Sequence, residues 1–147
     1  GQAQLAQMEE RKNQPHIKTP DQVTDNLQKD AALAGESIYY KYCGICHQSN
    51  GKGARGRWPA LTDPQWIAGD KASLISIVLN GLEGEIEVNG IAYNEVMPQH
   101  SFLSDIEIAE VLSYVRQSFG NDAPAITAEE VRKVREGSAT NYEKPTP

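Results

Sequence analysis

The sequence Cys43-Gly44-Ile45-Cys46-His47 decides the fold of this chain. Two cysteines separated by two residues, with a histidine directly after the second, form the attachment pattern of a c-type haem. Each thiol adds across one vinyl group of the porphyrin, and the short reach between the cysteines matches the two adjacent vinyls. The histidine then lies below the iron as its proximal ligand. The motif therefore predicts that Cys43 and Cys46 anchor one covalent haem c and that His47 binds its iron.

Three other chemistries fit this cysteine spacing less well. A thioredoxin-like redox pair needs a strand before the motif and a helix after it, whereas here a helical pattern comes first. A zinc site needs two further ligands, and the remaining histidines, His16 and His100, lie far away in the sequence. A disulfide across so tight a loop would be strained.

The composition fits one domain with extensions. Of the 147 residues, 39% are hydrophobic but only 7% are aromatic, and a buried haem would supply apolar surface that the core otherwise lacks. No apolar run reaches membrane-spanning length and no signal peptide precedes Gly1, so a chain with covalent haem is expected to be a processed or excised form. The net charge of −6 argues against a nucleic-acid partner.

Two helices are predicted to pack against each other. One begins at Asp30, its N-cap, and ends at about Cys43. Gly35 and Tyr39 lie on the same face as Cys43, and the glycine lets another helix approach closely. The second helix covers residues 105–119, begins in a Ser-Asp-Ile-Glu capping box and ends before a glycine.

Between these helices the chain is mostly loop. A glycine-rich basic segment, residues 51–57, follows the motif, but no strand precedes it and no P-loop pattern supports phosphate binding. A third helix is expected over residues 71–80. A hairpin follows over residues 85–93, with Asn89-Gly90 at its turn, and leads directly to Met97-Pro98.

These patterns divide the chain into four parts. They are an N-terminal arm (1–30), a haem domain (31–120), an appended short helix (121–137) and a disordered tail (138–147). The arm, with a short helix starting near Thr19, is either a strap or tether to a partner or a disordered terminus. The appended helix opens at Thr127, in a second capping box.

The sixth iron ligand decides between electron transfer and bond-making chemistry. Met97 is the preferred candidate, because the hairpin would carry it to the opposite haem face and Pro98 fixes the backbone there. His100 is the rival ligand, and an open site is the third possibility. A thioether ligand would raise the reduction potential and favour electron transfer.

Residues 31–120 resemble the class I c-type cytochromes. The resemblance rests on the haem motif, Gly35 with Tyr39, Met97-Pro98 and a terminal helix with Tyr114. It implies a mainly α fold, with helices packed around one covalently bound haem, a small β-hairpin and, here, N- and C-terminal extensions. In this family the first and last helices cross at a glycine–aromatic contact, matched here by Gly35 and Tyr39 against Val111 and Tyr114.

The resemblance also implies two further contacts of the cofactor. Pro59 matches the proline whose carbonyl accepts a hydrogen bond from the proximal histidine and so orients its ring. Trp66 is expected near a haem propionate, the alternative being a partly exposed hydrophobic anchor. Residues 84–97 are similar to a bacterial subgroup, although glycine often stands there at the position of Glu95.

Members of that subgroup serve as soluble carriers or as cytochrome domains of larger enzymes. The resemblance thus implies a monomeric, periplasmic one-electron carrier with redox protein partners and no catalytic residue in the bond-making sense. The alternative is a cytochrome domain or subunit of a terminal oxidase, nitrite reductase or periplasmic dehydrogenase. A haem enzyme or gas sensor with an open distal site is the hypothesis from a different class.

Overall fold

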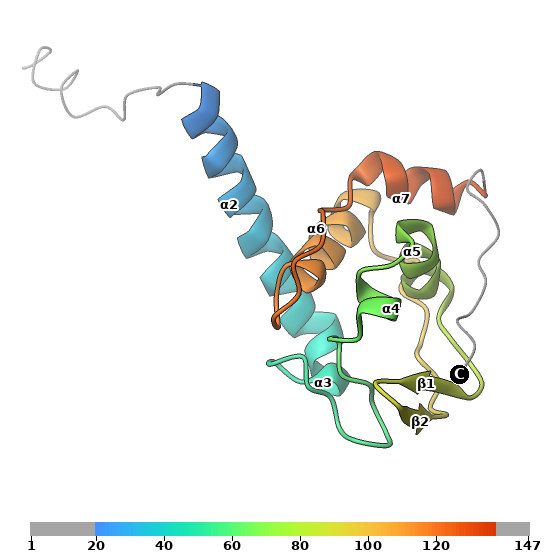
Figure 1. Cartoon of the computed structure of the whole chain (residues 1–147). Helices are drawn as coiled ribbons and strands as arrows, with labels where there is room; N and C mark the ends of the chain where they lie inside the picture. Colours follow the sequence, from blue (N-terminus) through green and yellow to red (C-terminus); the bar gives the residue numbers. More distant parts are fainter. Residues whose placement is uncertain (1–19, 138–147) are drawn as a thin grey trace, which may run out of the picture. The chain divides into compact units, whose positions relative to one another are not determined.

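The computed structural model describes residues 20–137, with side chains from Lys29 onward. Its elements (Figure 1) are α2 (Pro20–Ile38), the π-helix η1 (Tyr39–Cys43), α3 (Gly44–His47), α4 (Pro64–Ile67), α5 (Lys71–Asn80), β1 (Ile86–Val88), β2 (Ile91–Tyr93), α6 (Asp105–Arg116) and α7 (Ala128–Arg135). This mainly helical fold with one two-stranded antiparallel hairpin confirms the predicted fold class.

The contacts within the chain define two compact units, residues 1–30 and 31–147. Residues 1–19 and 138–147, with most of the predicted arm and all of the predicted tail, lie outside the described residues. The core and the site described below belong to the second unit.

The helix before the haem motif begins earlier than predicted, at Pro20 rather than at Asp30. Proline is favoured at the first helical position, where its missing N–H is not needed, and Asp30 lies within the helix instead of capping it. At Tyr39 the helix widens into the π-turn η1, and the N–H of Gly44 closes this turn on the carbonyl of Tyr39. Such turns often occur at functional sites, and this one ends at Cys43, the first cysteine of the motif.

The predicted close approach at Gly35 is present. A Cβ atom on Gly35 would overlap the carbonyl oxygen of Glu110 and lie 2.9 Å from Cβ of Tyr114, both on α6. One turn further along, the rings of Tyr39 and Tyr114 lie 5.6 Å apart between centroids. The absence of a side chain at Gly35 therefore sets how closely this helix packs against α6.

The helix α6 is shorter than predicted and ends at Arg116 instead of residue 119. Its start is as predicted, since Ser104 and Glu107 form the capping box. The early end has a tertiary cause: Phe119 adopts a positive φ of 58° and turns the chain back. Its ring covers Gly51, where an added Cβ would lie 2.5 Å from the ring.

The local signals of the middle region are confirmed. Asp70 caps α5 by accepting from the N–H of Ser73, and the helix ends before Gly81. In the hairpin Val88 pairs with Ile91 around the Asn89-Gly90 turn. The short helix α4 was not predicted, because four residues are too few to show a period.

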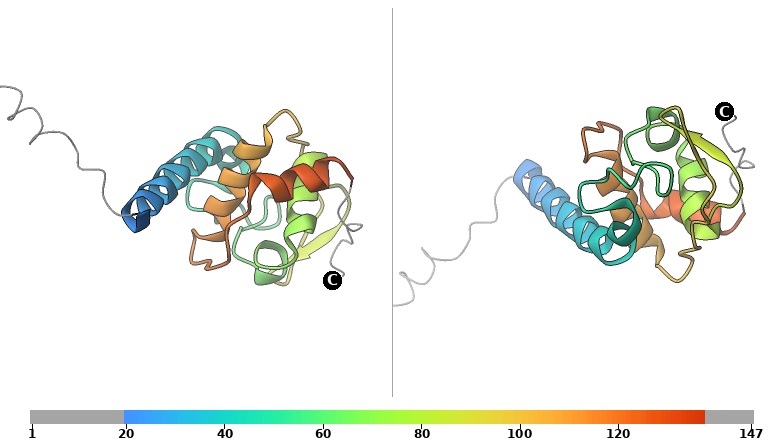
Figure 2. Two further views of the ribbon diagram at one scale, coloured as in Figure 1. Left: turned by 90° about the horizontal axis from the view of Figure 1, so that it is seen from above. Right: turned by 90° about the horizontal axis from the view of Figure 1, so that it is seen from below.

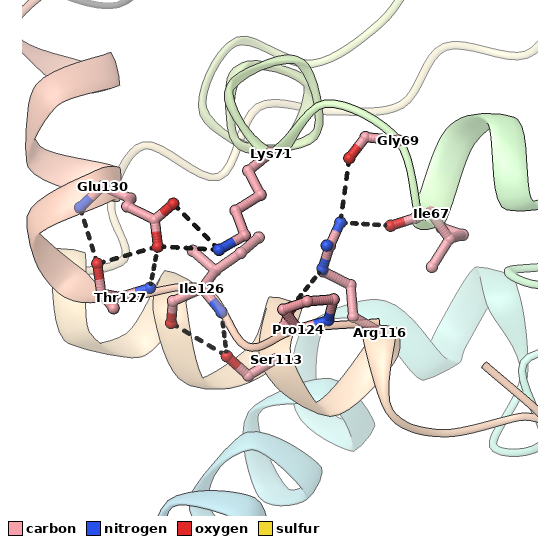
Figure 3. Close-up of polar contacts among 9 residues, drawn as sticks. All are labelled: Ile67, Gly69, Lys71, Ser113, Arg116, Pro124, Ile126, Thr127 and Glu130. Atoms are coloured by element: carbon pink, nitrogen blue, oxygen red, sulfur yellow. Dashed lines mark hydrogen bonds and ion pairs between the residues drawn. The ribbon is translucent and has the colours of Figure 1, made fainter. Parts of the chain in front are cut away.

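The appended helix α7 packs on α5 and α6, and Figure 2 shows it lying across α5. It begins with the predicted capping box between Thr127 and Glu130, and Val131 on its inner face is fully buried. Polar contacts reinforce this packing (Figure 3): Lys71 on α5 pairs with Glu130 at 3.3 Å. Through Ile126 and Val131, the segment after residue 120 thus contributes to the core as far as the described residues extend.

Candidate cofactor site

An apolar cleft lies at the centre of the second unit and encloses about 830 Å³ of space, part of it open to solvent. Its wall comes from η1, α3, α4, α5, β1 and α6 and from the loops between them. The lining residues are Cys43, His47, Pro59, Ala60, Leu61, Trp66, Ile67, Leu74, Ile77, Val78, Leu82, Ile86, Val88, Met97, His100, Leu103, Val111, Leu112 and Val115.

His47 is held in one orientation at this wall. Its Nδ1 lies 2.8 Å from the carbonyl oxygen of Pro59, and because a carbonyl only accepts, the proton is on Nδ1. The unprotonated Nε2 is therefore left as a possible metal ligand. Burial lowers the pKa of the His47 imidazole, while the bond to Pro59 opposes this shift. The site thus favours the neutral imidazole, which is the form that binds metals.

The two cysteines of the motif lie beside His47 as free thiols. Burial raises the pKa of the Cys43 thiol to about 11, with an added contribution from Cys46. Elsewhere, no three His, Cys, Asp or Glu side chains of the described part converge to hold a metal ion. Cys43 and His47 line the apolar cleft, and Cys46 directly precedes His47 in the chain. Two thiols and one free imidazole nitrogen are the groups that a covalently attached haem needs.

Met97 lines the same cleft and is fixed there through its backbone. Its N–H donates to the carbonyl of Leu82 at 2.9 Å, and the N–H of Leu82 donates back at 3.1 Å. Gly81 makes this pairing possible, because a Cβ there would lie 2.5 Å from the carbonyl oxygen of Met97. The structure therefore brings the predicted thioether ligand and His47 to one cavity.

His100, the rival ligand, also lines the cleft. Its backbone N–H donates to the carbonyl of Val78 at 2.8 Å, and its ring packs against Tyr42 and Phe102. The Nδ1 of His100 is buried and has no hydrogen-bond partner among the described residues.

Trp66 lies at the wall of the cleft, but its polar group is engaged elsewhere. The indole N–H donates to the carbonyl of Glu87 at 2.9 Å, which ties α4 to β1. The contact between Trp66 and a haem propionate stays a prediction.

Sequence reasoning missed most of the apolar wall. Ile77 and Val78 on α5, Leu82 after it, and Ile86 and Val88 of the hairpin all face the cavity. The available signal was the apolar character of α5 and the alternation in β1, which together predict burial but do not tell a protein core from a cofactor cleft.

The model of the cytochrome c family matches residues 32–119 of this chain. The chain belongs to the cytochrome c family. A cytochrome c-552 of Thermus thermophilus is 40% identical to it over 114 residues, which cover 71% of this chain and 76% of that relative. The match and the cleft agree: this cytochrome is a class I, monohaem c-type cytochrome, it carries covalently bound haem c, and it transfers electrons.

Other relatives are parts of larger assemblies. The cytochrome c subunit of a quinone-type alcohol dehydrogenase from Gluconacetobacter polyoxogenes is 34% identical over 113 residues, which cover 74% of this cytochrome and 24% of that subunit. The cytochrome c subunit of a gluconate 2-dehydrogenase from Pantoea cypripedii is 36% identical over 122 residues, or 78% of this cytochrome and 27% of that subunit. Within the described residues, no helix is both long and apolar enough to cross a bilayer.

Proposed function

We propose that this cytochrome is a one-electron carrier whose haem iron is bound by His47 and Met97 and whose porphyrin is bonded to Cys43 and Cys46. The observation that carries the proposal is the shared cleft: the free imidazole nitrogen of His47 and the thioether of Met97 belong to one apolar cavity that also contains Cys43. When bound, the haem supplies the iron redox couple.

The side chains of the cleft have three tasks in this proposal. Pro59 keeps the His47 ring in one tautomer and orientation through the 2.8 Å bond. The backbone pairing with Leu82 holds Met97 in place, and its soft thioether favours the reduced iron and raises the potential. The apolar walls exclude water, so that little solvent reorganises when the charge of the iron changes.

Two protein ligands leave no position for oxygen or peroxide, and for this reason we assign no bond-making catalytic role to any residue. The electron partners are redox proteins of the periplasm, and the protein acts as a monomer. In a variant of the proposal it serves as a cytochrome domain or subunit of a dehydrogenase, nitrite reductase or oxidase, which is supported by the two dehydrogenase subunits among its relatives.

The ligand assignment is tested in the oxidised holoprotein through the weak near-infrared absorption band of a sulfur–iron bond. Met97→Ala is expected to abolish this band and to lower the potential, whereas His100→Ala keeps the band. If the band persists in Met97→Ala and is lost in His100→Ala, the assignment of Met97 is wrong.

Carbon monoxide separates the carrier from the open-site alternative. The reduced wild-type protein is expected not to change its spectrum under the gas, whereas reduced Met97→Ala binds it. Rapid and complete binding by the wild type would instead support a haem enzyme or a gas sensor.

A further inference from the structure

Arg135, in the last turn of α7, forms a three-bond contact with the segment that follows Met97. Its Nε donates to Oδ1 of Asp105 at 2.8 Å, its Nη1 to the carbonyl of Ser101 at 2.9 Å, and its Nη2 to the carbonyl of Leu103 at 2.7 Å. The side chains of Arg135 and Asp105 are each 32% exposed, so the pair is only partly open to water. A guanidinium binds several acceptors in a fixed fork, which gives such a contact geometric precision.

The segment that Arg135 holds, residues 98–104, is the loop between Met97 and α6. Its inner side lines the cofactor cleft through His100 and Leu103. Few backbone bonds fix it: the N–H of His100 donates to Val78, and the N–H of Leu103 donates to His100 at 3.1 Å. Leu103 is a buried residue, 3% exposed, and its carbonyl is one of the three acceptors of Arg135.

The helix that carries Arg135 is anchored independently of this contact. Val131 is fully buried in the core, Glu130 pairs with Lys71 of α5, and Ser113 of α6 exchanges hydrogen bonds with the backbone of Ile126. These last two contacts are drawn in Figure 3. α7 is therefore a firm base from which Arg135 reaches the loop. It also lies beyond residues 32–119, the part that matches the family model.

We propose that Arg135 is a positioning residue for the distal ligand: by clamping residues 101–105 to α7 it keeps Met97 at the iron and slows its exchange for external ligands. This inference rests on the proposed ligation by Met97. Without the clamp, the loop loses three hydrogen bonds to α7 and opens more often, although the backbone bonds of His100 and Leu103, the capping box of Ser104 and the pairing of Met97 with Leu82 remain.

The test measures imidazole binding to the oxidised holoprotein, in which imidazole competes with the protein ligand for the sixth position. Arg135→Ala should bind imidazole about fivefold to tenfold more tightly than the wild type, because only part of the free energy of the lost charge-assisted hydrogen bonds acts on Met97. Arg135→Lys, which keeps the charge but not the fork, should lie between the two.

Two control variants separate the clamp from simpler effects. Arg132→Ala removes the same charge from the same helix, but in the described structure Arg132 forms its ion pairs with Glu129 of α7 and with Glu136, the C-cap of α7. Lys71→Ala removes one partly exposed anchor of α7 without touching the loop, and the buried Val131 and the bonds between Ser113 and Ile126 still hold the helix. Both are expected to bind imidazole like the wild type, and an equal gain in either control would overturn the clamp.

Hydrogen exchange gives a readout that does not depend on the iron ligand. The amide of Leu103 should exchange faster in Arg135→Ala, whereas the amide of Val131 should keep its wild-type rate. Unchanged exchange at Leu103 contradicts the clamp itself. Absence of the sulfur–iron band in the wild-type protein would contradict the ligation by Met97 and, with it, the proposed effect of Arg135 on that ligand. The exchange rate of the Leu103 amide would still test whether Arg135 holds the loop.

Discussion

The indole N–H of Trp66 donates to the carbonyl oxygen of Glu87 at 2.9 Å and so joins α4 to the hairpin at the wall of the cofactor cleft. Trp66→Phe keeps an aromatic wall but removes this bond. We expect the holoprotein to lose about 1–2 kcal/mol of unfolding free energy from the lost hydrogen bond and packing. The midpoint of denaturant unfolding, followed by haem absorbance, measures this loss.

A matched control is Trp58→Phe. Trp58 packs under the guanidinium of Arg57 at 4.3 Å and does not line the cleft. This variant should lose less than Trp66→Phe, and an equal or larger loss would show that the bond to Glu87 contributes little.

Gly35→Ala tests the close crossing of α2 and α6. The added methyl group would overlap the carbonyl oxygen of Glu110, so one of the two helices must shift. Overpacking of this kind costs about 1–3 kcal/mol, although alanine is intrinsically the better helix former. Ser37→Ala, at an exposed position of the same helix, is the control and should be neutral or slightly stabilising. A Gly35→Ala protein as stable as the wild type in thermal unfolding would contradict the crossing.

Elements with strong local signals could be predicted from the sequence alone. Asp70 and Gly81 delimit α5, Asn89-Gly90 turns the hairpin, and Thr127 with Glu130 opens α7; each signal acts within a few residues. The haem motif is equally local, which is why Cys43, Cys46 and His47 needed no tertiary information.

Features set by distant parts of the chain could not be predicted. The end of α6 depends on Phe119 packing over Gly51. The acceptors of Arg135 lie 30 to 34 residues before it in the sequence. The start of α2 was misplaced because Asp30 has the residue type of an N-cap, while the preceding polar residues also suit a helix. Pro59 was identified only through the family resemblance, since nothing in its local sequence indicates a bond to His47.

Arg116 is a buried cation whose removal should cost more stability than the removal of any exposed charge. It is 2% exposed and donates to the carbonyls of Pro124 and Ile67, each at 2.8 Å (Figure 3). Arg116→Met leaves these acceptors without a donor, and we expect a loss of about 2–4 kcal/mol. Burial lowers the pKa of the guanidinium, but a group with so high an ordinary pKa stays charged at neutral pH.

Two comparisons complete this experiment. Arg116→Lys keeps the charge but not the fork and should recover only part of the stability. Arg132→Met removes an exposed charge from α7 and should cost at most about 1 kcal/mol. Equal unfolding midpoints for Arg116→Met and Arg132→Met would contradict the structural role of Arg116.

The last prediction concerns the encounter with a redox partner. Three large apolar side chains near the cleft are exposed: Ile45 in the haem motif (74%), Val96 beside Met97 (60%) and Phe102 in the following loop (64%). The charges of residues 31–120 are unevenly spread, with basic side chains after His47 and acidic ones around the hairpin. Long-range charge mainly sets the association rate, so a surface without a ring of lysines should depend on apolar contact.

We therefore expect the rate of electron transfer with the physiological partner to vary only weakly with ionic strength, measured by stopped-flow reduction over a salt series. Phe102→Ser should slow the reaction at every salt concentration, because it removes apolar contact area. The triple variant Lys52→Glu/Arg55→Glu/Arg57→Glu tests the basic loop, whose three side chains are exposed. A steep fall of the wild-type rate with salt would refute apolar docking, and an unchanged rate in the triple variant would remove the basic loop from the interface.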